Sequence, residues 1–128
     1  MPGKQKYELE YVINASPKVL FSRLSTPGGL SEWFADDVNI EGSVLTFMWD
    51  KTIQKAELLC QKENRVVRFR WLDDPDPKSF FEFRITQDSL TNDVSLTIID
   101  FAEENDIDDA KGLWDKQISQ LFSQLGSA

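Results

Sequence analysis

Apolar side chains recur most regularly near the end of the chain, between Asn105 and Leu125. They fall at every third or fourth position, which is the spacing of one face of a helix. The members of this stripe are Ile107, Ala110, Trp114, Ile118, Leu121 and Leu125, and Leu113 and Phe122 widen it. Because a helix of about 20 residues is roughly 30 Å long, the pattern predicts a helix that crosses one face of a small domain.

Ahead of this segment, the period changes from that of a helix to that of a strand. Apolar and polar residues alternate over short segments separated by short polar turns, which is typical of an antiparallel sheet. The loop at 73–77 contains two prolines, which interrupt backbone hydrogen bonding. The predicted strands are Tyr7 to Ile13, Val38 to Ile40, Leu45 to Trp49, Thr52 to Gln61, Val67 to Trp71, Phe81 to Ile85 and Asp93 to Phe101.

Two short helices are predicted between the first two strands. Ser16 is a preferred N-cap residue, and Pro17 suits the first position of the helix that follows. The sequence Thr26-Pro27-Gly28-Gly29 ends this helix, and Leu30 to Phe34 form the second one. The order of elements is therefore one strand, two short helices, six strands and the long helix.

This order predicts an α+β fold. The inner face of the sheet carries Tyr, Phe and Trp on most strands, and the last helix is the element with enough apolar surface to cover that face. We therefore expect a curved antiparallel sheet of six to seven strands with the long helix across its concave face. The length of 128 residues fits a single domain over residues 1–128.

Aromatic residues are frequent, with four Trp, nine Phe and two Tyr. They fit either a packed core or a cavity for an apolar ligand, and composition alone favours the core. The net charge of −8 is unfavourable for binding nucleic acid or an anionic membrane surface. No apolar run approaches the roughly 20 residues of a membrane span, and residues 1–6 lack the apolar stretch of a signal peptide.

The chain has few residues that bind metals or cofactors. It contains no histidine and one cysteine, Cys60, which argues against zinc and haem sites and against an intrachain disulfide. The acids Asp73, Asp74 and Asp76 lack the ligand spacing of a calcium loop, and the adjacent pair Asp108-Asp109 lacks it too, so solvated turns are favoured there. We expect a cytoplasmic protein without a cofactor.

Several short motifs, taken with the element order, resemble a known family. They are Ser16-Pro17-Lys18-Val19-Leu20-Phe21, Thr26-Pro27-Gly28-Gly29-Leu30-Ser31-Glu32-Trp33-Phe34 and Gly112-Leu113-Trp114. Together they resemble the helix-grip fold of the START-like (Bet v 1-like, or SRPBCC) superfamily. Within it, the chain is most similar to the group related to the activator of heat shock protein 90 ATPase. These motifs are structural, so they specify the fold better than the function.

The resemblance implies a cavity between the long helix and the concave sheet, which the superfamily uses for lipids, polyketides, hormones and other apolar molecules. For any single residue of the implied wall, a packed core side chain is the favoured reading, whereas the group taken together strengthens the case for a cavity. The implied wall residues are Trp33, Phe47, Trp49, Phe69, Trp71, Phe83, Trp114, Ile118 and Phe122. Tyr11 and Asp100 are the polar candidates, and a solvated position at the strand end is the favoured reading for Asp100.

Three functions follow from these readings. The first is a non-enzymatic domain that binds a small hydrophobic ligand, since the histidine-based chemistry of catalytic superfamily members is missing and Arg68, Arg70, Glu57 and Glu82 fall on the outward face. The second is a co-chaperone-like domain that binds a protein. The third, less favoured, is a cyclase or dehydratase that uses Tyr11 or Asp100. Outward apolar residues favour a homodimer or a protein partner: Ile53, Leu59, Phe80 and Ile99.

Overall fold

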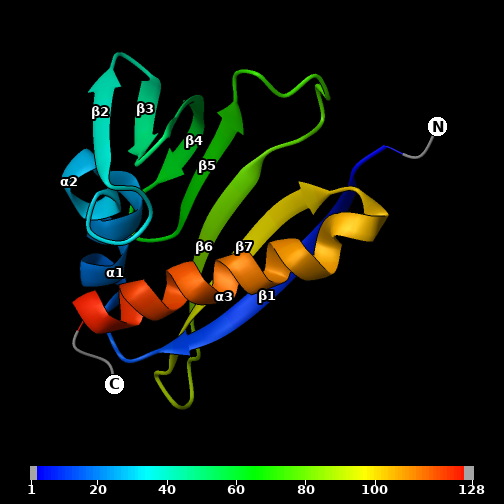
Figure 1. The fold of residues 1–128 in the computed structure, drawn as a ribbon. Coiled ribbons are helices and arrows are strands. Elements are labelled where there is room, and N and C mark those ends of the chain that lie inside the picture. The colour runs from blue at the N-terminus through cyan, green and yellow to red at the C-terminus, as the bar shows by residue number, and fades with distance from the viewer. Residues whose placement is uncertain (1–2, 126–128) are drawn as a thin grey trace.

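The computed structural model describes residues 3–125 and shows a long helix lying across the concave face of one curved antiparallel sheet (Figure 1). The first and last residues of the predicted domain, 1–2 and 126–128, lie outside the described residues. The elements in order are β1 (Gln5–Ile13), α1 (Pro17–Ser25), α2 (Pro27–Leu30), β2 (Asp37–Glu41), β3 (Val44–Trp49), β4 (Thr52–Lys62), β5 (Val66–Trp71), β6 (Phe81–Gln87), β7 (Val94–Ala102), the 3₁₀ turn η1 (Glu104–Asp106) and α3 (Ile107–Gln124). The predicted fold class is confirmed.

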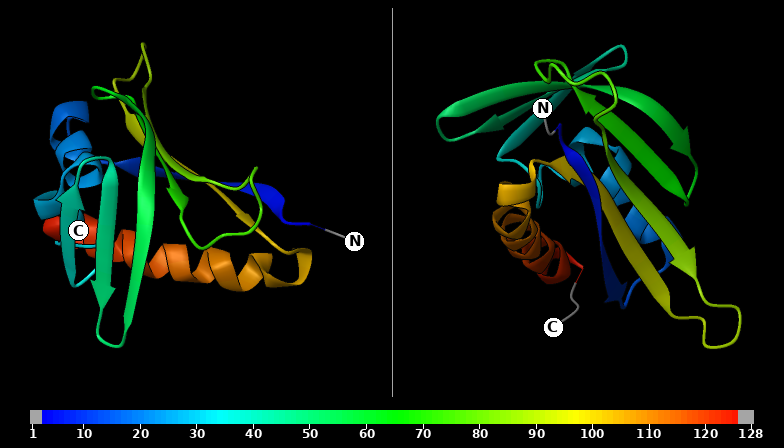
Figure 2. Two further views of the ribbon diagram at one scale, coloured as in Figure 1. Left: turned by 90° about the horizontal axis from the view of Figure 1, so that it is seen from above. Right: turned by 90° about the vertical axis from the view of Figure 1, so that its right-hand side faces the viewer.

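The seven strands lie in the order β1-β7-β6-β5-β4-β3-β2. Strands β2 to β6 each pair with the next strand of the chain, as short turns require, and β1 pairs with β7 at one edge of the sheet. The register shifts between Leu58 and Cys60 on β4, at a bulge that adds to the curvature. Figure 2 shows α3 inside the curve, with α1 and α2 at one end of the sheet.

Helix α3 buries one stripe of its surface, as its spacing predicts. Trp114, Ile118 and Leu121 are buried against the sheet, and Phe122 is half-buried. The prediction that Leu113 widens the buried stripe is wrong, because 64% of the surface of this residue is exposed. The buried face is therefore narrower than predicted, and most of the apolar cover on the concave side comes from large rings rather than from a wide stripe.

The second short helix begins earlier than predicted. Helix α2 occupies Pro27–Leu30, whereas residues 31–34 of the helix expected at 30–34 form a turn. Thr26 caps α2, since its Oγ1 accepts a hydrogen bond of 3.0 Å from the amide of Gly29. Pro27 takes the first helical position, where a missing N–H costs nothing. The same proline that ends α1 thus starts α2.

The outer, convex face of the sheet is also partly covered. Ile53 and Leu59 are exposed there, as predicted. Ile99 was expected to be exposed and is not: only 5% of its surface is accessible, beside Glu82 in the register. Phe80 is half-buried against Phe101, with ring centroids 5.0 Å apart. The guanidinium of Arg68 also lies over the ring of Phe80, so the apolar surface left for a partner is smaller than expected.

Gly29 is required where α2 packs on α1. A Cβ atom at this position would overlap the carbonyl oxygen of Ser22 and would lie 2.7 Å from the Cα of Arg23. Both of these atoms belong to the backbone of α1, so a side chain could be accommodated only by moving one helix. Gly28, in the same helix, has nothing within 4 Å of such an atom.

We expect Gly29→Ala to lower the free energy of unfolding by about 1–3 kcal/mol, because it overpacks the contact between α1 and α2. Gly28→Ala is the matched control, and it should be neutral or gain up to about 1 kcal/mol from the better helix former. Urea unfolding followed by circular dichroism measures both values. Equal effects of the two substitutions would contradict this account of the helix contact.

Candidate ligand site

The space between α3 and the sheet contains a cluster of aromatic rings centred on Phe34. This residue follows α2 and is 4% exposed. Its ring centroid lies 5.2 Å from that of Phe47 and 5.8 Å from that of Trp114, so it joins the sheet to α3. The other rings that it contacts are Trp33, Trp49, Trp71, Phe81 and Phe83. Phe34 thus lies where the family resemblance places a ligand cavity.

The predicted wall residues fall into two groups. Phe47, Phe69, Phe83 and Ile118 are at most 1% exposed, and Trp33 and Trp114 are buried. Trp49, Trp71, Phe122, Tyr11 and Asp100 are half-buried. All except Asp100 are members of the core or pack against it, and the ring of Tyr11 also meets that of Phe122. The half-buried group presents most of the surface that a ligand could contact, and of the buried group Trp33 lines an opening described below. A binding role for either group stays a prediction.

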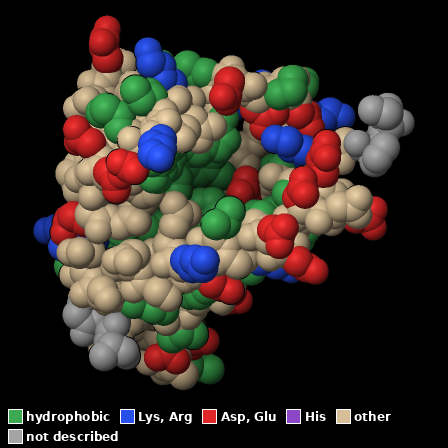
Figure 3. All heavy atoms as spheres, viewed as in Figure 1, with side chains coloured by type: hydrophobic (Ala, Val, Ile, Leu, Met, Phe, Trp, Pro, Cys, Tyr) green, Lys and Arg blue, Asp and Glu red, His purple; other side chains and the backbone are tan. Residues whose placement is uncertain are grey.

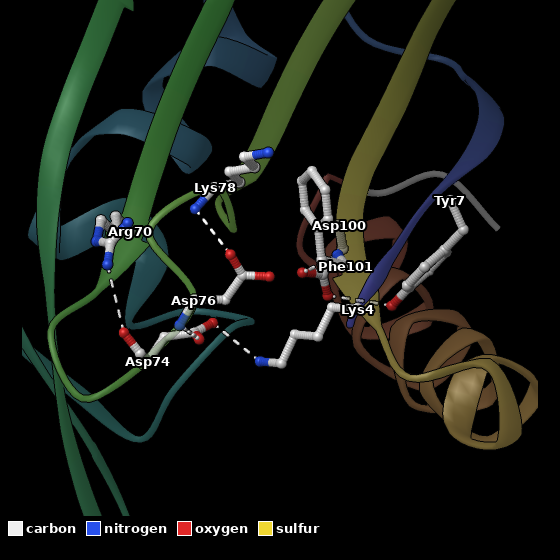
Figure 4. Close-up of polar contacts among 8 residues, drawn as sticks. All are labelled: Lys4, Tyr7, Arg70, Asp74, Asp76, Lys78, Asp100 and Phe101. Carbon is white, nitrogen blue, oxygen red and sulfur yellow. Dashed lines mark hydrogen bonds and ion pairs between the residues drawn. The ribbon is translucent and has the colours of Figure 1, made fainter. Parts of the chain in front are cut away.

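Asp100 points inward from β7 and joins three elements (Figure 4). Its Oδ2 accepts hydrogen bonds from the hydroxyl of Tyr7 (3.1 Å) and from Nε1 of Trp114 (2.9 Å). Its Oδ1 accepts a bond of 2.8 Å from the amide of Phe101. The favoured reading of a solvated strand end is therefore wrong, because strand parity turns this carboxylate toward α3.

Burial raises the pKa of Asp100, and the hydrogen bonds from Trp114, Phe101 and Tyr7 offset only part of that effect. The pKa of the Tyr7 hydroxyl is raised as well, first by burial and then by the neighbouring carboxylate. Since both oxygens of Asp100 already accept bonds from the protein, this group holds β1, β7 and α3 together.

Tyr11 lies at the edge of the contact between β1 and α3. Its hydroxyl donates a hydrogen bond of 2.5 Å to Oδ1 of Asp115 on α3. Its ring meets that of Phe122 edge-on, with centroids 6.4 Å apart. Burial and the bond to Asp115 raise the pKa of this hydroxyl. Tyr11 and Asp100 therefore form two separate polar contacts between the sheet and the helix.

Two openings reach the aromatic cluster from the surface, and they share no lining residue. The larger, which we call the groove, has a volume of about 520 Å³ between the turn after α2 and the second half of α3. It is lined by Ser31, Glu32, Trp33, Phe34, Ala35, Asp36, Trp49, Gln117 and Gln120. The carbonyl oxygen of Phe34 accepts bonds from Nε1 of Trp49 (3.0 Å) and from Nε2 of Gln117 (3.1 Å), which fixes the turn against β3 and α3.

The smaller opening, which we call the β1 pocket, has a volume of about 120 Å³. Lys4 closes one side by reaching from the start of β1 to Asp74 in the loop after β5, with Nζ 2.9 Å from Oδ2 (Figure 4). Burial alone would raise the pKa of Asp74, but the bonds from Lys4 and from the amide of Asp76 hold it below its usual value. The other lining residues are Trp71, Ser79, Phe80, Asp100 and Phe101.

The surface between α3 and the strands above it is hollowed, with hydrophobic side chains on its floor and acidic ones at its side (Figure 3). Among residues 3–125, no group of three or more His, Cys, Asp and Glu side chains could hold a metal ion. Within the same residues, no helix is long and apolar enough to cross a membrane.

Comparison with known families identifies the fold. The model of the START-like superfamily domain matches residues 1–127. The chain belongs to the START-like superfamily. A search of curated proteins found no match.

Solved structures agree with this START-like assignment. BfR322 from Bacteroides fragilis is 38% identical over 97% of this chain and 92% of its own, with a TM-score of 0.70. The Aha1 dimer from Colwellia psychrerythraea is 18% identical over 94% of this chain and 96% of its own, with a TM-score of 0.78. CalU16 from Micromonospora echinospora is 15% identical over 98% and 77%, with a TM-score of 0.73. At such low identity, the last two show the fold alone.

Sequence reasoning missed two central residues of this START-like domain. Phe34 was assigned to the end of a helix, and Phe81 was assigned to a strand without a place in the wall. The rings of Phe81 and Trp71 stack with centroids 4.8 Å apart. Phe81 could have been predicted as a wall residue, because it lies two positions before Phe83 on β6 and therefore points to the same inner face of the sheet. No periodic signal could have placed Phe34, because its position depends on where α2 begins.

The raised pKa of Asp100 predicts how stability depends on pH. Because the folded state binds the proton more tightly, the stabilisation from this group is complete below the unfolded pKa of about 4 and is lost as pH rises through the folded value. The difference in unfolding free energy between the natural chain and Asp100→Asn, measured in urea, should therefore fall as pH rises from about 4 to 7. A difference that grows over this range would contradict the assignment.

Proposed function

We propose that this START-like domain is a non-enzymatic binding protein that holds a small amphipathic molecule in the groove beside Phe34. The carrying observation is the groove itself, since its volume of about 520 Å³ lies in the range of roughly 300–1,000 Å³ that is usual for small-molecule sites. Its lining combines the aromatic residues Trp33, Phe34 and Trp49 with five polar or acidic residues, so it suits a ligand that has both an apolar and a polar part. The groove uses two of the predicted wall residues, Trp33 and Trp49.

The lining of the groove indicates the chemistry of the ligand. Trp49 and Phe34 offer ring surface to an apolar body, and the amide of Gln120 is exposed for a hydrogen bond. The carboxylates of Glu32 and Asp36 line the groove, in a protein of net charge −8. Glu32 is paired with Arg23, with Oε2 3.4 Å from Nε, so Asp36 is the carboxylate left to act on a ligand. A neutral or cationic polar group therefore suits the site better than an anionic one.

Phe34 sets how deep the ligand can lie. Its ring fills the space between Phe47 and Trp114, and its carbonyl is held by hydrogen bonds from Trp49 and Gln117. A ligand in the groove consequently rests against the face of the aromatic cluster and does not enter the middle of the helix–sheet layer. This distinguishes the proposed site from the deep cavity that the family resemblance implies.

A protein-interaction role, including a homodimer, is the second candidate. Ile53 and Leu59 on β4 are 66% and 46% exposed and give the convex side an apolar surface. One solved structure of the same fold is that of an Aha1 dimer. Light scattering after size-exclusion chromatography tests this role: a dimer that Ile53→Glu converts to a monomer would support it, and a monomer at all concentrations would exclude the homodimer.

The groove is tested by filling it from α3. Gln120 is exposed and lines the groove, whereas Gln124, one turn further along the same helix, is exposed outside it. The neutral fluorescent probe N-phenyl-1-naphthylamine should bind the natural chain with saturation, and Gln120→Trp should weaken binding about tenfold or more by occupying the space, since each factor of ten is about 1.4 kcal/mol.

Gln124→Trp is the matched control and should bind the probe as the natural chain does. Native mass spectrometry of freshly purified protein should also show a retained molecule that the Gln120→Trp variant lacks. Saturable binding that both tryptophan variants preserve would place the site elsewhere, and absence of saturable binding would overturn the proposed function.

A further inference from the structure

A second cleft, separate from the groove, lies at the ends of β5 and β6. Its volume is about 290 Å³, and its lining residues are Lys62, Arg65, Val66, Arg84, Ile85 and Thr86. Three of these six are cationic and none is acidic. The chain as a whole carries 14 Lys and Arg against 22 Asp and Glu, so a cleft whose charged lining residues are all cationic is opposite in sign to the net charge of the molecule.

The strand register gathers these cations. Lys62 on β4 pairs with Val66 on β5, and Val66 pairs with Arg84 on β6, so the three lie in one row across the sheet. The next residue, Val67, is sealed in the core. Because successive side chains of a strand point to opposite faces, this row faces away from α3. The cleft is therefore on the convex side of the sheet.

Arg84 is held in place by a buried carboxylate. Glu82, two residues earlier on the same face of β6, is 0% exposed at its side chain. Its Oε2 lies 2.8 Å from Nη2 of Arg84, and its Oε1 accepts a bond of 2.7 Å from Nε of Arg68. Arg68 also stacks on Phe80, with 4.0 Å from Cζ to the ring centroid. One carboxylate thus orients two guanidinium groups and neutralises only one of them.

The turn between β4 and β5 brings the other two cations to the cleft. The amide of Arg65 donates a bond of 2.9 Å to the carbonyl of Lys62, which closes the turn, and Asn64 takes the positive φ of 62° that this turn needs. The carbonyl of Arg65 then accepts a bond of 2.7 Å from the amide of Ile85 on β6. The backbone that carries Lys62 and Arg65 is therefore fixed, while both side chains are exposed.

We propose that this cleft binds an oxyanion, a phosphate or carboxylate group of a small molecule. Lys62, Arg65, Arg68 and Arg84 give four positive charges, Glu82 removes one, and the exposed Glu63 in the turn removes another, which leaves two. The guanidinium of Arg84, which Glu82 orients, and the exposed cations of Lys62 and Arg65 can bind an oxyanion through their N–H donors. The net charge of −8 repels a long polyanion such as nucleic acid, so the ligand is small.

Titration of ¹⁵N-labelled protein with inorganic phosphate, pyrophosphate and citrate at constant ionic strength tests this site. Saturable shifts are expected at the backbone amides of Arg65, Val66, Ile85 and Thr86, with a dissociation constant near or below about 1 mM. Tighter binding of pyrophosphate assigns the site to phosphate groups, and tighter binding of citrate assigns it to carboxylates. The absence of saturable shifts at these amides up to about 10 mM, where such a site would be mostly occupied, overturns the proposal.

The double variant Lys62→Gln/Arg65→Gln should weaken anion binding about tenfold or more, because it removes two of the donors that contact the oxyanion. Lys51→Gln/Lys55→Gln is the matched control, since it removes the same charge from exposed positions at the β3–β4 hairpin. Equal weakening in both variants would show a general charge effect and would overturn the site. Probe binding in the groove should be unchanged by either pair, so this proposal and the proposed function can fail independently.

Discussion

Contact between the concave face of the sheet and α3 is made by aromatic rings, and the other features of the molecule depend on that contact. The rings stack in a continuous layer in which Phe34 touches side chains of the sheet and Trp114 of the helix. Aromatic pairs of this kind add about 0.5–1.5 kcal/mol each beyond the area that they bury. Asp100 adds a directional contact to this layer: its hydrogen bond from Nε1 of Trp114 fixes the position of α3 relative to β7.

Because the layer is closed by the protein's own side chains, a ligand site can lie only where the layer meets the surface. The turn that carries Phe34 ends at such a place, and the groove beside it is walled by α3 on one side and by the end of β3 on the other. Lys4 and Asp74 similarly bound the β1 pocket, which shares no lining residue with the groove. The curved sheet therefore determines where the openings lie, and the local turns determine their chemistry.

The sequence predicted the fold because its period is regular. Alternation along β3, β5 and β6 requires Phe47, Phe69 and Phe83 to share one face, and only α3 has the apolar stripe to cover them. Phe34 could not be placed in this way, since its position depends on a helix boundary set by Pro27 and Thr26. The position of Asp100 was predicted wrongly for a related reason. Strand parity gives the direction of its carboxylate, but the hydrogen-bond donors of Tyr7 and Trp114 become apparent only when β1 and α3 are in place.

The buried carboxylate of Glu82 on the convex face is explained by its ion pairs and could not be predicted from the alternation of polar and apolar residues. Glu82 has the outward parity that the sequence predicts, yet it is sealed because Arg68 and Arg84 lie on either side of it. A buried carboxylate is costly unless each oxygen is satisfied, and here each oxygen has its own guanidinium. The single negative charge of Glu82 neutralises only one of the two guanidinium groups, so a positive excess remains at the ends of β5 and β6. The two faces of the sheet consequently differ in chemistry, with carboxylates in the lining of the groove and cations across the convex row.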